Sequence, residues 1–143
     1  MKSLFVDTNI VIDLLAKREQ FYEDAAILFS LADKKKVEAA VSSLTIAIAY
    51  YIVQKNNSNA ATKEILRKLK TIVKVLSVDD KIISSALDDN SFKDFEDAIQ
   101  YYTALENRQD LIITRNMKDY KTSIIPVMTP GEFIKSLSWE YLG

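Results

Sequence analysis

Short apolar runs alternate with longer amphipathic stretches along this chain. The runs at 4–6, 39–41, 73–78, 111–113 and 124–127 have the length and apolar character of strands that are covered on both faces. Between them, apolar residues recur every three or four positions, which predicts helices. Strands that alternate with helices predict an α/β fold, a three-layer sandwich in which a central parallel sheet of about five strands carries helices on both faces.

Three helical segments have patterns of their own. Residues 44–54 are almost wholly apolar, which predicts a helix buried on most sides. Residues 63–74 carry four lysines and one arginine around an apolar stripe, a pattern that favours a solvated face over contact with a phosphate backbone. Thr129, Pro130 and Glu132 have the spacing of a capping box and predict the start of the last helix.

Composition narrows the class of protein. A length of 143 residues, 48% hydrophobic and 27% charged, predicts one globular domain over residues 1–143. No apolar run approaches the roughly 20 residues of a membrane span, and the N-terminus lacks the features of a signal peptide, so we expect a cytoplasmic protein. The net charge of −1 argues against coating nucleic acid by bulk attraction.

The absence of cysteine and histidine restricts the chemistry further. It excludes disulfides, thiol nucleophiles, histidine general bases, catalytic triads and the usual zinc ligands. Any reaction must therefore use carboxylates, lysine, tyrosine, hydroxyls or a metal held by oxygen atoms.

Acidic residues fall at three points where a parallel sheet exposes its ligand-binding edge. Asp7 directly follows the first predicted strand, Asp94 and Asp97 open a helix, and Asp119 follows the fourth strand. Capping offers an alternative, with Asp7 or Thr8 starting one helix and Asp94 with Asp97 starting another. Capping alone does not account for Asp119. Two close carboxylates stay ionised only beside a cation, because otherwise one pKa rises.

A cluster of carboxylate oxygens indicates a particular class of metal site. Oxygen ligands without histidine or cysteine suit Mg²⁺ or Mn²⁺ better than zinc. The commonest use of such a site is phosphate-ester chemistry, in which the metal activates a water and neutralises charge on the phosphate.

Several short blocks resemble the signature of a known family. The segments 6–9 (Val-Asp-Thr-Asn), 93–98 (Lys-Asp-Phe-Glu-Asp-Ala) and 114–120 (Thr-Arg-Asn-Met-Lys-Asp-Tyr) are similar, in order and spacing, to the signature blocks of the PIN-domain family. The segments 41–45 and 127–133 agree with it as well. The resemblance covers essentially the whole chain, and several blocks in register are far more specific than one.

The resemblance implies a function and site residues. PIN domains are mostly Mg²⁺- or Mn²⁺-dependent ribonucleases, and many bacterial ones are toxins of toxin–antitoxin pairs, so it implies an RNA substrate, an antitoxin protein and, as in many members, a homodimer. It assigns metal roles to Asp7, Asp97 and Asp119, with Asp94 close by. Arg115 corresponds to a phosphate contact, with a solvated loop arginine as the alternative. The polar positions that orient the acids or the water are Thr8, Asn9, Thr114 and Asn116.

One position departs from the family pattern. Many members carry a glutamate in the helix after the second strand, which by alignment falls near Ile48, and neither Ile48 nor its neighbours Ala47 and Ala49 can ligate a metal. A subgroup of the family also lacks this acid. With one charge fewer, a second metal should bind weakly or only with the substrate's phosphate. A second interpretation therefore remains, in which the domain binds RNA or a protein partner without cutting.

Two further interpretations rest on single features. A haloacid-dehalogenase-like phosphatase requires a second acid two residues after the first, where this chain has Asn9, and we discount it. The tyrosine pairs at 50–51 and 101–102 could stack on bases, but packing within half-buried helices is favoured.

Overall fold

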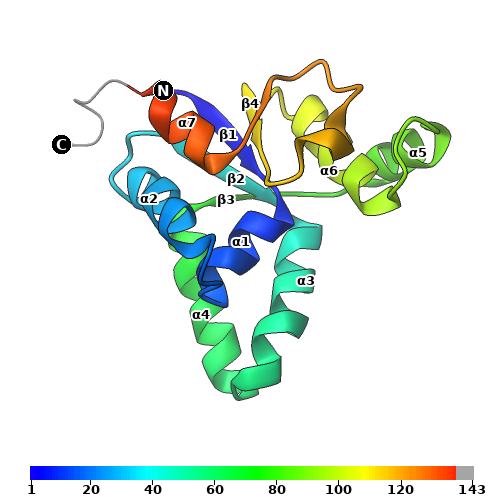
Figure 1. The fold of residues 1–143 in the computed structure, drawn as a ribbon. Coiled ribbons are helices and arrows are strands. Elements are labelled where there is room, and N and C mark those ends of the chain that lie inside the picture. The colour runs from blue at the N-terminus through cyan, green and yellow to red at the C-terminus, as the bar shows by residue number, and fades with distance from the viewer. Residues whose placement is uncertain (138–143) are drawn as a thin grey trace.

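Five parallel strands form the central sheet, in the order β3-β2-β1-β4-β5. The structure is a computed structural model, and it describes residues 1–137. The predicted α/β sandwich with a five-stranded parallel sheet is confirmed (Figure 1). The strands are β1 (Ser3–Val6), β2 (Glu38–Ser42), β3 (Lys74–Leu76), β4 (Leu111–Ile113) and β5 (Val127–Met128).

The first strand lies at the centre of the sheet and is buried on both faces. Phe5 of β1 is in register with Ala40 of β2 on one side and with Ile112 of β4 on the other. Leu4 and Val6 contribute to the core on one face and Phe5 to the core on the opposite face. This alternation explains why the strand is an unbroken apolar run.

Helices cover both faces of the sheet (Figure 1). One face is covered by α1, α2, α3, α4 and α7, and the other by α6, against which α5 packs. Two short 3₁₀ helices, η1 and η2, complete the described elements. The helix bounds are α1 (Thr8–Leu15), α2 (Tyr22–Asp33), α3 (Ser43–Val53), η1 (Gln54–Asn56), α4 (Asn59–Ile72), α5 (Asp80–Asp88), α6 (Phe95–Glu106), η2 (Met117–Tyr120) and α7 (Pro130–Ser136).

Side-chain caps fix where several helices begin. Ser42 caps α3 through the Thr45 backbone N–H, and Asp79 caps α5 through the Ile82 N–H. The predicted capping box of α7 is confirmed, because the side chains and backbone N–H groups of Thr129 and Glu132 bond reciprocally. No helix within residues 1–137 has the length and apolar character needed to span a membrane.

The prediction for residues 44–54 was wrong about burial. The helix α3 exists, but its buried residues are Thr45, Ala49 and Val53 alone, and the Tyr51 side chain is 64% exposed. Figure 1 shows the reason, because α3 and α4 run away from the sheet together to a shared turn. Only part of α3 therefore meets the sheet, most of its other apolar residues are half-buried, and Tyr51 faces outward.

Two strands are shorter than the sequence indicated. The third covers Lys74–Leu76 rather than 73–78, and the fifth covers only Val127–Met128 rather than 124–127. Ser123 accounts for the second difference, because its hydroxyl accepts from the Ile125 N–H and donates to the Ile125 carbonyl, which holds this segment in a turn. Ile124 is consequently 79% exposed.

Candidate active site

The strand order creates a crevice at one point of the sheet edge. The chain passes from β1 to β2 on one side, and β4 later joins β1 on the other, so the order reverses between β1 and β4. Open parallel sheets bind ligands outside the carboxyl ends of the strands at such a switch point. Asp7 and Thr114 immediately follow these two strands, and the Asp7 N–H donates to the Ile113 carbonyl at 2.9 Å.

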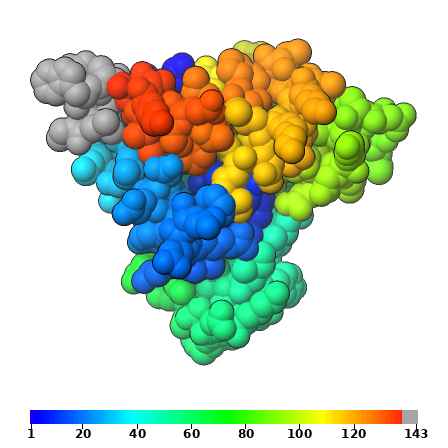
Figure 2. Space-filling model, in the orientation of Figure 1, coloured from blue at the N-terminus to red at the C-terminus, as the bar shows by residue number. Residues whose placement is uncertain are grey.

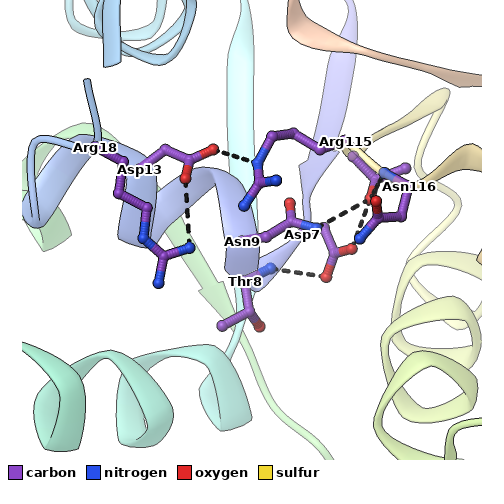
Figure 3. Close-up of polar contacts among 8 residues, drawn as sticks. Asp7, Thr8, Asn9, Asp13, Arg18, Arg115 and Asn116 are labelled. Atoms are coloured by element: carbon purple, nitrogen blue, oxygen red, sulfur yellow. Dashed lines mark hydrogen bonds and ion pairs between the residues drawn. The ribbon is translucent and has the colours of Figure 1, made fainter. Parts of the chain in front are cut away.

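Asp7 is a buried carboxylate held by uncharged donors. Its side chain is the cap of α1 and accepts from the Thr8 backbone N–H at 2.8 Å (Figure 3). The second carboxylate oxygen accepts from the Thr114 hydroxyl at 2.8 Å. Burial raises the pKa of Asp7, while these two hydrogen bonds and the nearby Tyr120 hydroxyl oppose that rise. Asp7 thus both caps a helix and lies at the sheet's ligand-binding edge.

Asp97 and Asp119 face Asp7 from other segments of the chain. Asp97 lies in the first turn of α6 and Asp119 lies in η2. Desolvation first, and then repulsion from Asp7, Asp119, Asp94 and Glu96, together raise the pKa of Asp97 to about 7. The three acids that the family pattern singles out are therefore near enough for their negative charges to repel one another.

Asp94 has a structural role in addition to its charge. It caps α6, and its side chain accepts from the Glu96 backbone N–H at 2.9 Å. The capping alternative therefore holds for Asp94. Its charge nevertheless raises the pKa of Asp97. Asp94 is exposed and lies at the border of the acidic group rather than at its centre.

The polar positions next to the acids form two sets of contacts. The Thr114 hydroxyl, which donates to Asp7, accepts from the Asn116 N–H at 3.2 Å and lies 3.5 Å from the Asn9 side-chain nitrogen. The Thr8 hydroxyl instead faces a buried network with Thr45 and Gln100. Thr114 thus positions the Asp7 carboxylate, and Thr8 connects α1 to the neighbouring helices.

Asp94, Asp97 and Asp119 line a cavity of about 540 Å³ that lysines also line. A polar amide lies among its lining groups, and three lysines reach it from the segments before α6 and after β4. The sequence interpretation assigned no function to these lysines, although two of them lie inside the signature blocks. The lining residues are Ser91, Lys93, Asp94, Asp97, Asn116, Lys118, Asp119 and Lys121.

Tyr120 is a second residue that the sequence interpretation left without a role. Its side chain is buried, at 2% exposure, and its hydroxyl lies next to the carboxylates of Asp7, Asp97 and Asp119. Burial and these negative charges raise the pKa of Tyr120 far above its usual range. No well-aligned hydrogen bond to this hydroxyl is present within residues 1–137. A buried polar group is therefore directed at the acids with its hydrogen-bonding capacity unused.

The donor set fits a hard divalent cation, although the site is not fully assembled. The side chains near Asp7 that could ligate a metal offer only oxygen atoms, and oxygen ligands suit Mg²⁺ or Mn²⁺. Mutual repulsion among the carboxylates is what a cation would relieve. In the described part of the chain, no three acidic side chains are yet close enough to form a metal-binding group. A bound cation would have to draw the carboxylates together.

Arg115 lies on the other side of the loop that follows β4. Its Nε donates to the Asp13 carboxylate at 2.7 Å, and its guanidinium lies 4.0 Å from the centre of the Phe21 ring. Arg18 approaches the other Asp13 oxygen at 3.6 Å (Figure 3). Arg115 is only 23% exposed, so it is not a solvated loop arginine. In Figure 2 the gold segment after β4 lies directly against the blue N-terminal helices.

A smaller cavity of about 380 Å³ adjoins this ion pair. It lies between α2, the start of α7 and the loop after β4, and Asn116 lines both this cavity and the acidic one. The loop carrying Arg115 and Asn116 thus separates two hollows, one with an ion pair and one with unpaired acids.

A parallel α/β domain with an acidic hollow at the switch point is the arrangement that the signature blocks implied. A family model described as "PIN domain" matches residues 3–118, and the chain belongs to the PIN-domain family.

Named relatives support the same grouping. The chain is 29% identical over 138 residues to a protein named Ribonuclease VapC1 from Aquifex aeolicus, covering 92% of this chain and 93% of that protein. A toxin–antitoxin complex from Klebsiella pneumoniae contains a chain with TM-score 0.64 and 26% identity, covering 90% of this chain and 98% of that one. A VapBC2 complex from Rickettsia felis, bound to a promoter DNA fragment, shares the fold with TM-score 0.66 and 16% identity, over 89% and 98%.

Proposed function

We propose that this protein is an endoribonuclease that hydrolyses RNA phosphodiester bonds with Mg²⁺ or Mn²⁺. The main supporting observation is that Asp7, Asp97 and Asp119 come from three distant segments and still lie near enough at this edge of the sheet to repel one another. None of the ion pairs among residues 1–137 involves these acids. Their charge is thus left for a cation from outside the chain.

The residues of the hollow would have different roles in such a reaction. Asp7, Asp97 and Asp119 would hold the metal, with Asp94 contributing charge from the border. A bound Mg²⁺ or Mn²⁺ supplies neutralisation of the phosphate charge and activation of a water. Thr114 fixes the Asp7 carboxylate by its hydrogen bond, and Asn116 fixes Thr114 in turn.

The lysines explain how an acidic hollow attracts a polyanion. Lys93, Lys118 and Lys121 line the cavity around the carboxylates and can contact phosphates on either side of the bond that is cut. Arg115 adds a cation nearby, although its Nε is already committed to Asp13. Phosphate contact by Arg115 would therefore use its terminal nitrogens.

We also propose that the protein is the toxin of a toxin–antitoxin pair. Support comes from the names of its relatives: the Aquifex protein is called a ribonuclease, and the Klebsiella structure is a toxin–antitoxin complex. The exposed Tyr51 and the half-buried apolar residues beside it on α3 offer area for an antitoxin or for a second copy of this chain. Because the proposed substrate is RNA, we propose that the protein acts in the cytoplasm.

A cleavage assay tests the proposal. Purified protein is incubated with structured and single-stranded RNA in Mn²⁺, in Mg²⁺ or in chelator, beside an Asp7→Asn variant. An Asp33→Asn variant is the matched control, because Asp33 is an exposed acid at the end of α2. We expect cleavage that requires metal, is lost in Asp7→Asn and is retained in Asp33→Asn. Cleavage that persists in chelator and in Asp7→Asn contradicts the proposal.

A second candidate function is RNA or protein binding without cleavage. The half-buried Ile48, in place of the family's glutamate, favours it. The same samples discriminate the two functions. Retention of RNA on the protein in Mn²⁺, with no cut product from any substrate, supports binding alone.

A further inference from the structure

We propose that Glu96 supplies the carboxylate that α3 lacks, so that the metal-binding group is completed from α6 instead. The inference rests on the proposed metal-dependent function and adds a ligand to its site. Glu96 belongs to one of the signature blocks, but the sequence interpretation gave it no role.

Three helices meet beside Asp7 in a buried hydrogen-bond network. The hydroxyls of Thr8 in α1 and Thr45 in α3 are 2.8 Å apart. The Gln100 side-chain nitrogen in α6 donates to both, at 2.8 Å and 3.0 Å. All three residues are at most 5% exposed. The network therefore fixes how α6 and α3 face each other across the start of α1.

Ile48 in α3 and Glu96 in α6 each lie one helical turn from a residue of this network. Ile48 lies three residues after Thr45, about one turn further along α3. Glu96 lies four residues before Gln100, one turn earlier on the same face of α6. Both positions thus lie one turn from a member of the same buried network, and both side chains are half-buried. The family's acid comes from the α3 side, and this chain carries one on the α6 side.

The Thr8 hydroxyl can form one more hydrogen bond than the network uses. Its hydroxyl oxygen can accept from Gln100 and from Thr45, which leaves its own proton to donate. The Glu96 carboxylate lies within hydrogen-bonding reach of that hydroxyl. Glu96 is half-buried, and its charge adds to the repulsion on Asp97. Its carboxylate thus faces inward, at the edge of the acidic group.

Helix stabilisation alone does not account for this placement. A glutamate in the first turn of a helix is stabilised by the unpaired N–H groups, but a solvent-facing side chain achieves the same. Here the side chain is half-buried beside other acids, and no ion pair among the described residues balances its charge. The buried, unpartnered Tyr120 hydroxyl independently shows that the same hollow has unused polar capacity.

Direct measurement of metal binding tests the inference without depending on RNA cleavage. Mn²⁺ affinity is measured by isothermal titration calorimetry for wild type, Asp7→Asn, Glu96→Gln and Glu64→Gln. Glu64 is the matched control, because it is an exposed helical glutamate paired with Arg67. We expect Glu96→Gln to weaken Mn²⁺ binding by about 10- to 100-fold, the range seen for groups that support a metal site. Glu64→Gln should bind as wild type does.

A positional swap makes the test sharper. Ile48→Glu is added to Glu96→Gln, which moves the acid from α6 back to α3. Ile48 is half-buried, so the position can accept a glutamate without burying its charge completely. We expect the double variant to regain most of the lost Mn²⁺ affinity, and circular dichroism to show the same fold in all variants. Loss of affinity through misfolding would not be recovered by the swap.

The outcomes separate this inference from the proposed function. If Asp7→Asn abolishes Mn²⁺ binding and Glu96→Gln leaves it unchanged, Glu96 is not a ligand and the proposed function stands. If Glu96→Gln weakens binding but the swap restores nothing, the equivalence of the two positions is wrong. If wild type binds no Mn²⁺, both the function and the inference are overturned.

Discussion

Two buried aspartates at the two ends of α1 lie in opposite electrostatic surroundings. Asp7 is 5% exposed and Asp13 is 0% exposed, and they are six residues apart. Asp13 contacts two arginines, whereas the partners of Asp7 are uncharged donors and other acids. A buried carboxylate with its own cations belongs to the scaffold, because its charge is already balanced. A buried carboxylate without them marks the place where a cation must come from outside.

The two regions are nevertheless connected through the loop that follows β4. Arg115 binds Asp13, and its neighbour Thr114 donates to Asp7. The ion pair therefore holds against α1 the same loop that positions the acid of the proposed site. The ion pair at Asp13 thus helps to fix the geometry around Asp7.

The largest expected effect comes from removing one of the two arginines that balance the charge of Asp13. Arg115→Met leaves the fully buried Asp13 with Arg18 alone, at 3.6 Å. We expect the free energy of unfolding to fall by about 3 kcal/mol, the low end for breaking a buried pair from one side. Urea unfolding followed by circular dichroism measures it.

The control for that prediction is an exposed ion pair. Arg67→Met removes the partner of Glu64 on the surface of α4 and should cost less than about 1 kcal/mol. Adding Asp13→Asn to Arg115→Met should recover part of the loss, because it removes the uncompensated charge. Equal losses for Arg115→Met and Arg67→Met would show that Asp13 needs no buried cation.

The next prediction concerns Asp7, where we expect a substitution to remove activity but not folding stability. Asp7→Asn removes a proposed metal ligand, and we expect cleavage to fall by about 100-fold or more, since even supporting groups around metals are worth 10- to 100-fold. In chelator, the same change removes a buried charge that has no cation, so the unfolding free energy should stay equal or rise. A variant that is both inactive and strongly destabilised would place Asp7 with the scaffold.

A smaller effect follows from the pKa of Asp97, which burial and neighbouring acids raise to about 7. From about pH 4 to pH 7 the folded, metal-free protein keeps a proton that the unfolded chain releases, so its stability falls as pH rises. Mn²⁺ should therefore raise the melting temperature more at pH 8 than at pH 6. Thermal unfolding in chelator and in Mn²⁺ measures both trends, and Asp97→Asn should weaken them.

The smallest effect concerns Asp94, which belongs partly to each kind of region. Asp94→Asn keeps a good helix cap, and we expect its unfolding free energy to stay within a few tenths of a kcal/mol of wild type. Asp94→Ala loses the hydrogen bond to the Glu96 N–H and should cost about 1 kcal/mol. If Asp94→Asn also leaves Mn²⁺ affinity unchanged, Asp94 is a cap and not a ligand.

Local signals predicted the elements and the positions of the acids. Asp7 could be placed at the end of a strand because an apolar run stops there, and Thr129 could be placed at a cap because its partner is three residues away. The burial of α3 was mispredicted because apolar content does not reveal what covers a helix. The metal roles of the acids stay a prediction.

Contacts across the sheet lay beyond the reach of the sequence pattern. Arg115 and Asp13 are 102 residues apart, and no periodicity connects them. The inward direction of Glu96 depends on how α6 sits against α1 and α3, which only the folded sheet determines. Patterns along the chain identify which residues can do chemistry, and packing decides which of them meet.

The central place of β1 has a consequence for biosynthesis. Thr114 is made 107 residues after its partner Asp7, and β4 must insert beside β1 before the two can meet. At about 5–20 residues per second, a ribosome needs several seconds or more to cover that interval. A prematurely terminated chain cannot assemble the acidic hollow, so fragments from aborted translation should be harmless to the RNA around them.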